Sequence, residues 1–159
     1  MIWNRIAPFA NLRTFLVLFA LTLGFFTYFA LTNPKMDALR RPPYFDRPND
    51  KLAEFLRPEL VDLVFPVVYS MMFAVAIVGL GKSLRVSHEF LLLPLFAWIA
   101  DWTENGCTIA MICQQMRTQR VSPTLAAILA AATPVKFAMF FGSCAVVILF
   151  AILKGLKRT

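Results

Sequence analysis

The chain has 159 residues, of which 59% are hydrophobic and 16% are charged, and its formal net charge is +7. Soluble domains are about 45–50% apolar, so this composition, with a mean hydropathy of +0.67, predicts an integral membrane protein rather than a soluble one. The short length leaves room for one domain, residues 1–159. The positive charge is expected to meet the anionic headgroups of membrane lipids. Nucleic-acid binding is not expected, because no basic and aromatic platform is present.

Four apolar runs approach or exceed the roughly 20 residues that a helix needs to cross a bilayer. They cover about residues 12–32, 58–80, 90–116 and 124–153. In lipid each span must satisfy its own backbone hydrogen bonds, so all of them are predicted to be helices. The expected fold is an all-α integral membrane protein, an antiparallel four-transmembrane-helix bundle with a short interfacial helix in the first loop.

The first run is predicted to be a membrane anchor and not a cleaved signal. Its apolar core is longer than the hydrophobic region of a signal peptide, and no small-residue cleavage site follows it. Arg13 stands at its entrance. Asn33-Pro34 is predicted to end the helix, because proline disfavours helical geometry in the residue before it.

The loop over residues 33–57 is predicted to combine an extended part with a short amphipathic helix. Pro42-Pro43 favours an extended course. Residues 50–57 are predicted to be helical, with Asn49 or Asp50 as the cap and with apolar side chains on the side facing the membrane surface, namely Leu52, Phe55 and Leu56. Pro58 suits the first turn of the next span.

The basic residues divide almost evenly between the two ends of the predicted bundle. One end carries Arg5, Arg13, Lys82, Arg85, Lys154, Lys157 and Arg158, and the other carries Lys35, Arg40, Arg41, Arg47, Lys51, Arg57, Arg117 and Arg120. The first set is concentrated close to helix ends in short segments, which favours the cytoplasmic side. A multi-pass membrane protein with both termini in the cytoplasm is therefore expected.

The third run carries polar side chains at its centre, in the segment IADWTENGCT. At 100° per residue, four of them share one helical face, with Trp98 nearby: Asp101, Glu104, Asn105 and Thr108. An ionised side chain at the bilayer centre costs at least about 2.5–3.5 kcal/mol. These groups are therefore expected to face the interior of the bundle, where they can be paired or hydrated.

Two further polar side chains, on the neighbouring spans, are predicted to lie at the same depth in the membrane as Asp101. If the turn between the second and third spans is centred near residue 85, Tyr69 lies opposite Asp101. If the turn between the third and fourth spans is centred between residues 118 and 119, Lys136 lies opposite Asp101. One lysine neutralises one carboxylate, so the second carboxylate is expected to hold a proton or to need a cation.

The preferred hypothesis is an intramembrane polar pocket that binds a hydrophobic or amphipathic ligand, such as a lipid or an isoprenoid. Asp101 and Glu104 are the candidate proton carriers, and the candidate ligand contacts are Tyr69, Trp98, Asn105, Thr108 and Lys136. Whether binding leads to a reaction stays open. Two alternatives remain: a small proton-coupled transporter working as a homo-oligomer, and an accessory subunit of a larger membrane complex whose polar groups hold helices together.

No cofactor or metal is expected at this site. The three cysteines form no C-x-x-C pair and the chain has one histidine, His88, which cannot supply a haem pair. The lysine predicted beside Asp101 and Glu104 argues against a metal bound by these two carboxylates.

The order of one span, a proline-rich loop with a surface helix and three closely linked spans resembles the layout of the EXPERA membrane family. This family includes sterol isomerases and sterol-binding proteins with acidic residues in an intramembrane pocket. The resemblance covers most of the chain, but the acidic positions of the family do not align with Asp101 and Glu104, so no residue role is carried over. In size the chain is also similar to small multidrug transporters, whose membrane glutamate lies in the first helix, where this chain has no acid.

Overall fold

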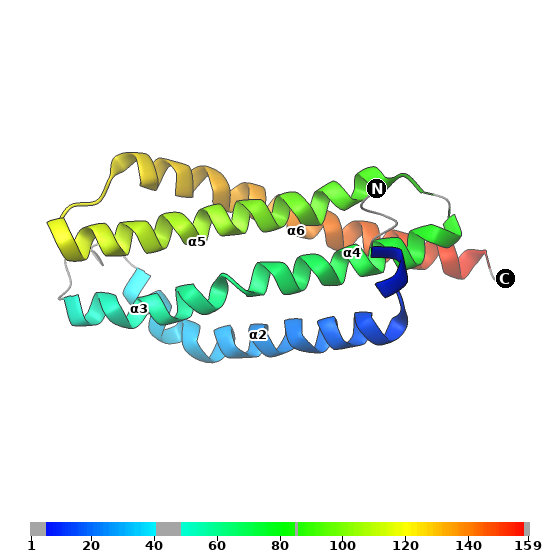
Figure 1. Cartoon of the computed structure of the whole chain (residues 1–159), viewed down its shortest axis with the longest axis horizontal. Helices are drawn as coiled ribbons and strands as arrows, with labels where there is room; N and C mark the ends of the chain where they lie inside the picture. Colours follow the sequence, from blue (N-terminus) through cyan, green and yellow to red (C-terminus); the bar gives the residue numbers. More distant parts are fainter. Residues whose placement is uncertain (1–5, 41–48, 85, 158–159) are drawn as a thin grey trace.

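The computed structural model describes residues 6–40, 49–84 and 86–157. Within these ranges the chain is all-helical, without strands, as the sequence predicts. The elements are η1 (Ala7–Phe9), α2 (Leu12–Arg40), α3 (Asn49–Asp62), α4 (Phe65–Leu84), η3 (His88–Leu91), α5 (Leu92–Thr118) and α6 (Pro123–Leu156). The long helices lie along the long axis of the molecule, and the chain reverses direction after α2, after α4 and after α5 (Figure 1).

The helix α4 is central, because it contacts α2, α5 and α6, while α5 packs along α6. Four of its inward side chains form a buried hydrophobic cluster with Ala97 of α5, and they are Phe65, Tyr69, Met72 and Phe73. The outer helices leave most of their apolar surface uncovered. In the most apolar stretch of α2, 6% of the residues are buried, and in that of α6, 11% are buried. In the most apolar stretch of Leu56–Leu84 the buried share is 56%.

Among the residues that the structure describes, three segments are long and apolar enough to cross a membrane: Leu12–Thr32, Leu56–Leu84 and Pro123–Leu156. The first coincides with the predicted span 12–32, and the other two enclose the predicted spans 58–80 and 124–153. The helix α5 has 27 residues and covers most of the predicted span 90–116, but it is not among the three. Its central polar residues lower its average hydropathy, so a membrane crossing by α5 stays a prediction.

Two predicted helix limits are wrong because prolines lie inside helices. The helix α2 continues past Asn33-Pro34 to Arg40. The helix α3 continues through Pro58 to Asp62, so Pro58 does not begin the next helix. The φ angle of proline is compatible with a helix, and each interior proline removes one hydrogen bond. The extended course predicted around Pro42-Pro43 and the side chains of Leu52 and Phe55 lie outside what the structure describes.

The helices α3 and α4 are separated by a short break at Leu63 and Val64. Pro66 follows it, and because proline has no N–H, the carbonyl of Asp62 has no donor four residues ahead. The N–H of Val67 donates to Val64 O at 3.2 Å and therefore not to Leu63. The carbonyls of Asp62 and Leu63 are thus left without their helical partners, next to the middle of α5.

Candidate functional site

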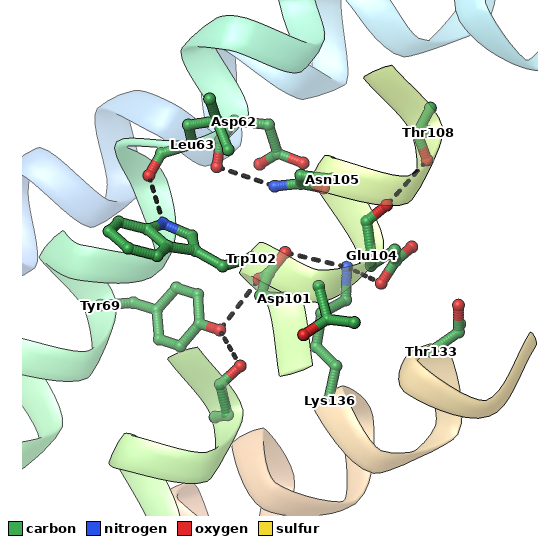
Figure 2. A network of polar contacts seen from close by, with 12 residues as sticks. Asp62, Leu63, Tyr69, Asp101, Trp102, Glu104, Asn105, Thr108, Thr133 and Lys136 are labelled. Atoms are coloured by element: carbon green, nitrogen blue, oxygen red, sulfur yellow. Dashed lines mark hydrogen bonds and ion pairs between the residues drawn. The ribbon is translucent and has the colours of Figure 1, made fainter. Parts of the chain in front are cut away.

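The charged cluster is built around one lysine of α6 that serves two acids of α5. Lys136 Nζ lies 2.6 Å from Glu104 Oε2 and 3.4 Å from Asp101 Oδ1, as Figure 2 shows. The Asp101 side chain is 5% exposed, Lys136 16% and Glu104 20%. The predicted pairing of Lys136 with Asp101 is thus present, and the lysine is closer still to Glu104.

The turn between α5 and α6 places this lysine at the level of the acids. Gln119 ends α5 in the left-handed conformation, with φ 55°, and its N–H donates to the carbonyl of Gln115. The helix α6 begins at Pro123 after this tight link. Glu104 lies 15 residues before Gln119 and Lys136 lies 14 residues after Ser122, so these two side chains stand at the same level on either side of the turn.

Tyr69 of α4 contacts the other oxygen of Asp101. Its hydroxyl lies 2.9 Å from Asp101 Oδ2 and 3.2 Å from the Ala97 carbonyl (Figure 2). A phenol has one proton to donate. When Asp101 is ionised, the two acceptors compete for this proton. When Asp101 is protonated, it can donate to the phenol while the phenol donates to Ala97. The arrangement therefore accommodates Asp101 in both protonation states.

Three phenylalanine rings pack around the ring of Tyr69. The rings of Phe65, Phe73 and Phe140 meet that of Tyr69 edge to face, with centroids 5.1, 6.3 and 5.2 Å away. Tyr69 itself is 1% exposed. The hydroxyl of Tyr69 thus reaches the charged cluster while its ring belongs to the apolar core.

Asn105 and Trp102 of α5 bind the two carbonyls that the break before α4 leaves free. Asn105 Nδ2 donates to the Asp62 carbonyl at 3.0 Å, and Trp102 Nε1 donates to the Leu63 carbonyl at 2.8 Å (Figure 2). Asn105 was predicted as a ligand contact, and its amide donor is engaged in joining helices. Trp102 makes a specific hydrogen bond that its sequence context does not predict.

One further acid, Asp62, approaches the cluster from α3, and a second, Glu59, lies one turn before it on the same helix. Glu59 is 4% exposed, and the Asp62 carboxylate interacts electrostatically with Asp101, Lys136 and Glu104. They are missing from the residues predicted for the site, because the second helix was expected to begin at Pro58. Their spacing of three residues would have placed both on one helical face, had the helix been continued through that proline.

Thr108 and Trp98 have surroundings that differ from those of the cluster. The Thr108 hydroxyl donates to the Glu104 carbonyl of its own helix at 3.0 Å. Trp98 lines a cavity of about 590 Å³ between α4, η3 and α5. A second cavity of about 390 Å³ is lined by residues of α2, α4 and α6. Neither of these two cavities is lined by Asp101, Glu104 or Lys136.

Over residues 6–40, 49–84 and 86–157, no group of three or more histidine, cysteine, aspartate or glutamate side chains is placed to hold a metal ion. Comparison with known proteins adds no assignment: no family model, no curated protein and no solved structure matches the chain. The function must therefore be argued from the residues of this site.

Proposed function

We propose that the chain is a multi-pass integral membrane protein in which α2, α3 with α4, α5 and α6 form an antiparallel four-transmembrane-helix bundle. The apolar surfaces of α2 and α6 support this proposal, because lipid would cover them. The helix α5 is also suited to contact lipid, since its polar residues Asp101 and Asn105 are buried while its apolar residues Phe96 and Ile99 are exposed. Both termini are proposed to lie in the cytoplasm.

Within this bundle we propose that the charged cluster binds a hydrophobic or amphipathic ligand, such as a lipid or an isoprenoid. The observation that supports this function is the sharing of Lys136 between Asp101 and Glu104. One ammonium cannot balance two carboxylates, and an unbalanced charge inside a membrane is costly. The cluster is therefore suited to hold a proton, which Asp101 or Glu104 passes to a ligand, or to accept a cationic group of the ligand.

Native mass spectrometry after gentle extraction tests this proposal. The wild type is expected to retain a small lipophilic molecule, and Glu104→Gln is expected to lose it with the fold intact. Glu89→Gln is the matched control, because Glu89 is exposed on η3 and lies outside the cluster. A wild type that retains no small molecule, or equal retention by all three proteins, would contradict the proposal.

A specific observation favours the alternative of an accessory subunit. Asn105 and Trp102 join α5 to the break before α4 by hydrogen bonds. In an accessory subunit, polar side chains inside the membrane are expected to hold helices together in this way. A subunit predicts a stable protein partner on mild extraction that Glu104→Gln does not remove. A proton-coupled transporter instead predicts a homo-oligomer and ligand-dependent proton release in liposomes.

A further inference from the structure

The cavity between α2, α4 and α6 is large enough for a hydrocarbon chain and too small to take up another helix. Its volume is about 390 Å³. On α6 its lining extends from Val147 to Lys154, which is about 10 Å at a rise of 1.5 Å per residue. A helix with its side chains is about 10 Å across, so a piece of helix of this length would need roughly 800 Å³. The cavity therefore fits a chain-like molecule.

The two polar residues of the lining lie where the apolar helices reach the membrane surface. The lining is apolar except for Asn11 and Lys154. Asn11 directly precedes the apolar segment Leu12–Thr32, and Lys154 directly follows Leu153, where the apolar run of α6 ends. Both residues lie at the end of the bundle where α2 begins and α6 ends (Figure 1). The polar mouth of the cavity is thus at the level of lipid headgroups in the proposed topology, and its apolar part is at the level of acyl chains.

The polar groups at this mouth are hydrogen-bond donors. Asn11 Oδ1 accepts from the N–H of Thr14 at 2.9 Å and from its hydroxyl at 3.2 Å, so the Nδ2 group of Asn11 is left to donate. The ammonium of Lys154 has only donors, and it makes no ion pair with any residue that the structure describes. The oxygens of a phosphate are charged acceptors that match both groups.

The end of the bundle around this mouth is basic. Its described basic side chains are Arg13, Lys82, Lys154 and Lys157, and none of them makes an ion pair within the part of the chain that the structure describes. Glu89 is the one acid among the described residues of this end. The uncompensated positive charge favours an anionic phospholipid over a zwitterionic one.

We infer that the cavity between α2, α4 and α6 binds one acyl chain of an anionic phospholipid, whose phosphate lies against Lys154 and Asn11. The chain enters from the bilayer between α2 and α6, because Leu12 and Ala151 line the cavity and are both exposed. The aliphatic stem of Lys154 packs along the acyl chain while its ammonium extends to the phosphate. This inference rests on the membrane insertion in the proposed function, and it does not depend on the ligand of the charged cluster.

Two phospholipids with the same acyl chains test the headgroup contact by titration of the purified full chain and native mass spectrometry. They are palmitoyl-oleoyl phosphatidylglycerol, which is anionic, and palmitoyl-oleoyl phosphatidylcholine, which is zwitterionic. The first phosphatidylglycerol is expected to bind about fivefold more tightly, the factor expected for one basic residue at an anionic headgroup. Lys154→Gln should remove this preference. Lys82→Gln is the matched control, since it makes the same charge change at an exposed position outside the cavity, and it should keep the preference.

Ala151→Phe tests the acyl-chain contact, because Ala151 lines the cavity from an exposed position and the larger ring would fill part of it. Both phospholipids are expected to bind this variant about tenfold more weakly, the loss expected when two methylenes are no longer buried. Ala145→Phe is the matched control. Ala145 is exposed on the same helix and does not line the cavity, so both affinities should stay unchanged.

Four results would overturn the inference. The two phospholipids could bind the wild type equally, or Lys154→Gln and Lys82→Gln could lower the preference equally, which would assign it to the whole basic end. Unchanged affinities in Ala151→Phe would mean that only the headgroup is bound. A dimer that Ala151→Phe dissociates would mean that a second copy of the chain covers the cavity.

Glu104→Gln separates this inference from the proposed function. If Glu104→Gln abolishes phosphatidylglycerol binding while Lys154→Gln has no effect, the phospholipid is the ligand of the charged cluster and the inference is wrong. If Lys154→Gln and Ala151→Phe act as expected while Glu104→Gln loses no retained molecule, the phospholipid binds in this cavity and the proposed role of the acids is wrong.

Discussion

At the scale of single residues, the shared lysine governs the stability of the charged cluster. Lys136→Met leaves Asp101 and Glu104 without their cation, and removing one partner of a buried pair costs about 3–5 kcal/mol. Glu104→Gln keeps the pair between Lys136 and Asp101, so its loss is expected to be clearly smaller. The free energy of unfolding in mixed micelles measures both changes.

The appropriate control for Lys136→Met lies on the same helix. Lys154 is in the last turn of α6 and makes no ion pair with any residue that the structure describes, so Lys154→Met is expected to cost little. Equal losses for the two lysine variants would show that Lys136 is not buried against the acids.

Replacing Asp101, Glu104 and Lys136 together by Asn, Gln and Met removes all three charges. If this triple variant has the stability of the wild type but no longer binds the ligand, the charges are needed for binding and not for folding.

Part of this residue-scale chemistry was predictable from the sequence. The pairs of Asp101 with Tyr69 and with Lys136 were predicted by reflection about turn centres near residue 85 and between residues 118 and 119. The observed link between α5 and α6 is centred two residues later, and the link between α4 and α5, which contains η3, is centred three residues later. Reflection therefore gives the depth of the partners to one or two helical turns. The partners of Asn105 and Trp102 were not predictable in the same way. They are backbone carbonyls, which become available only where the break before Pro66 removes their usual donors.

At the scale of elements, the break between α3 and α4 and the middle of α5 depend on each other. Asn105→Leu leaves the Asp62 carbonyl without a donor and is expected to cost about 1–3 kcal/mol. Pro66→Ala restores an N–H four residues ahead of that carbonyl. In the Pro66→Ala background, Asn105→Leu is therefore expected to cost clearly less, and the difference measures the coupling in a double-mutant cycle.

Thr103→Val provides the reference for this cycle. The Thr103 hydroxyl is exposed and donates to Ile99 of its own helix, so its removal should be nearly neutral and unaffected by Pro66→Ala. If Asn105→Leu costs the same with and without Pro66, the amide does not compensate for the missing backbone N–H, and the account of the break is wrong.

The helix limits show what the sequence could and could not predict about elements. The apolar stretch Leu12–Thr32 has the predicted bounds because hydropathy fixes it directly. The ends of α2 and α3 differ from prediction because Pro34 and Pro58 were expected to lie at helix ends. A proline costs a helix one hydrogen bond, and only the surrounding structure decides whether the helix continues. The same misjudgement kept Glu59 and Asp62 out of the predicted site.

At the scale of the whole molecule, α5 has inward and outward faces of different polarity. Asn105 and Gln115 are buried, while Phe96 and Ile99 of the same helix are exposed. Averaging hydropathy along the chain mixes these two faces, which explains why α5 falls below the apolar content of the other three segments. The all-α class was predictable from composition and run length, but the crossing by α5 depends on which of its residues face inward.

The crossing by α5 predicts that its two ends lie on opposite sides of the membrane. Lys82 precedes α5, Arg120 follows it, Lys157 follows α6, and all three are exposed. Each is replaced by cysteine in a chain whose native cysteines, Cys107, Cys113 and Cys144, are replaced by alanine. A membrane-impermeant maleimide added to intact cells is expected to label Arg120→Cys alone, since the other two positions face the cytoplasm in the proposed topology.

Permeabilised cells provide the control, because there all three cysteines should react. Labelling of Lys82→Cys and Lys157→Cys but not Arg120→Cys in intact cells would keep the crossing by α5 and reverse the proposed orientation. Labelling of Lys82→Cys and Arg120→Cys from the same side would mean that α5 does not cross. The acids of the charged cluster would then lie outside the bilayer centre, and the cost of unbalanced charge in lipid, on which the proposed function depends, would no longer apply to them.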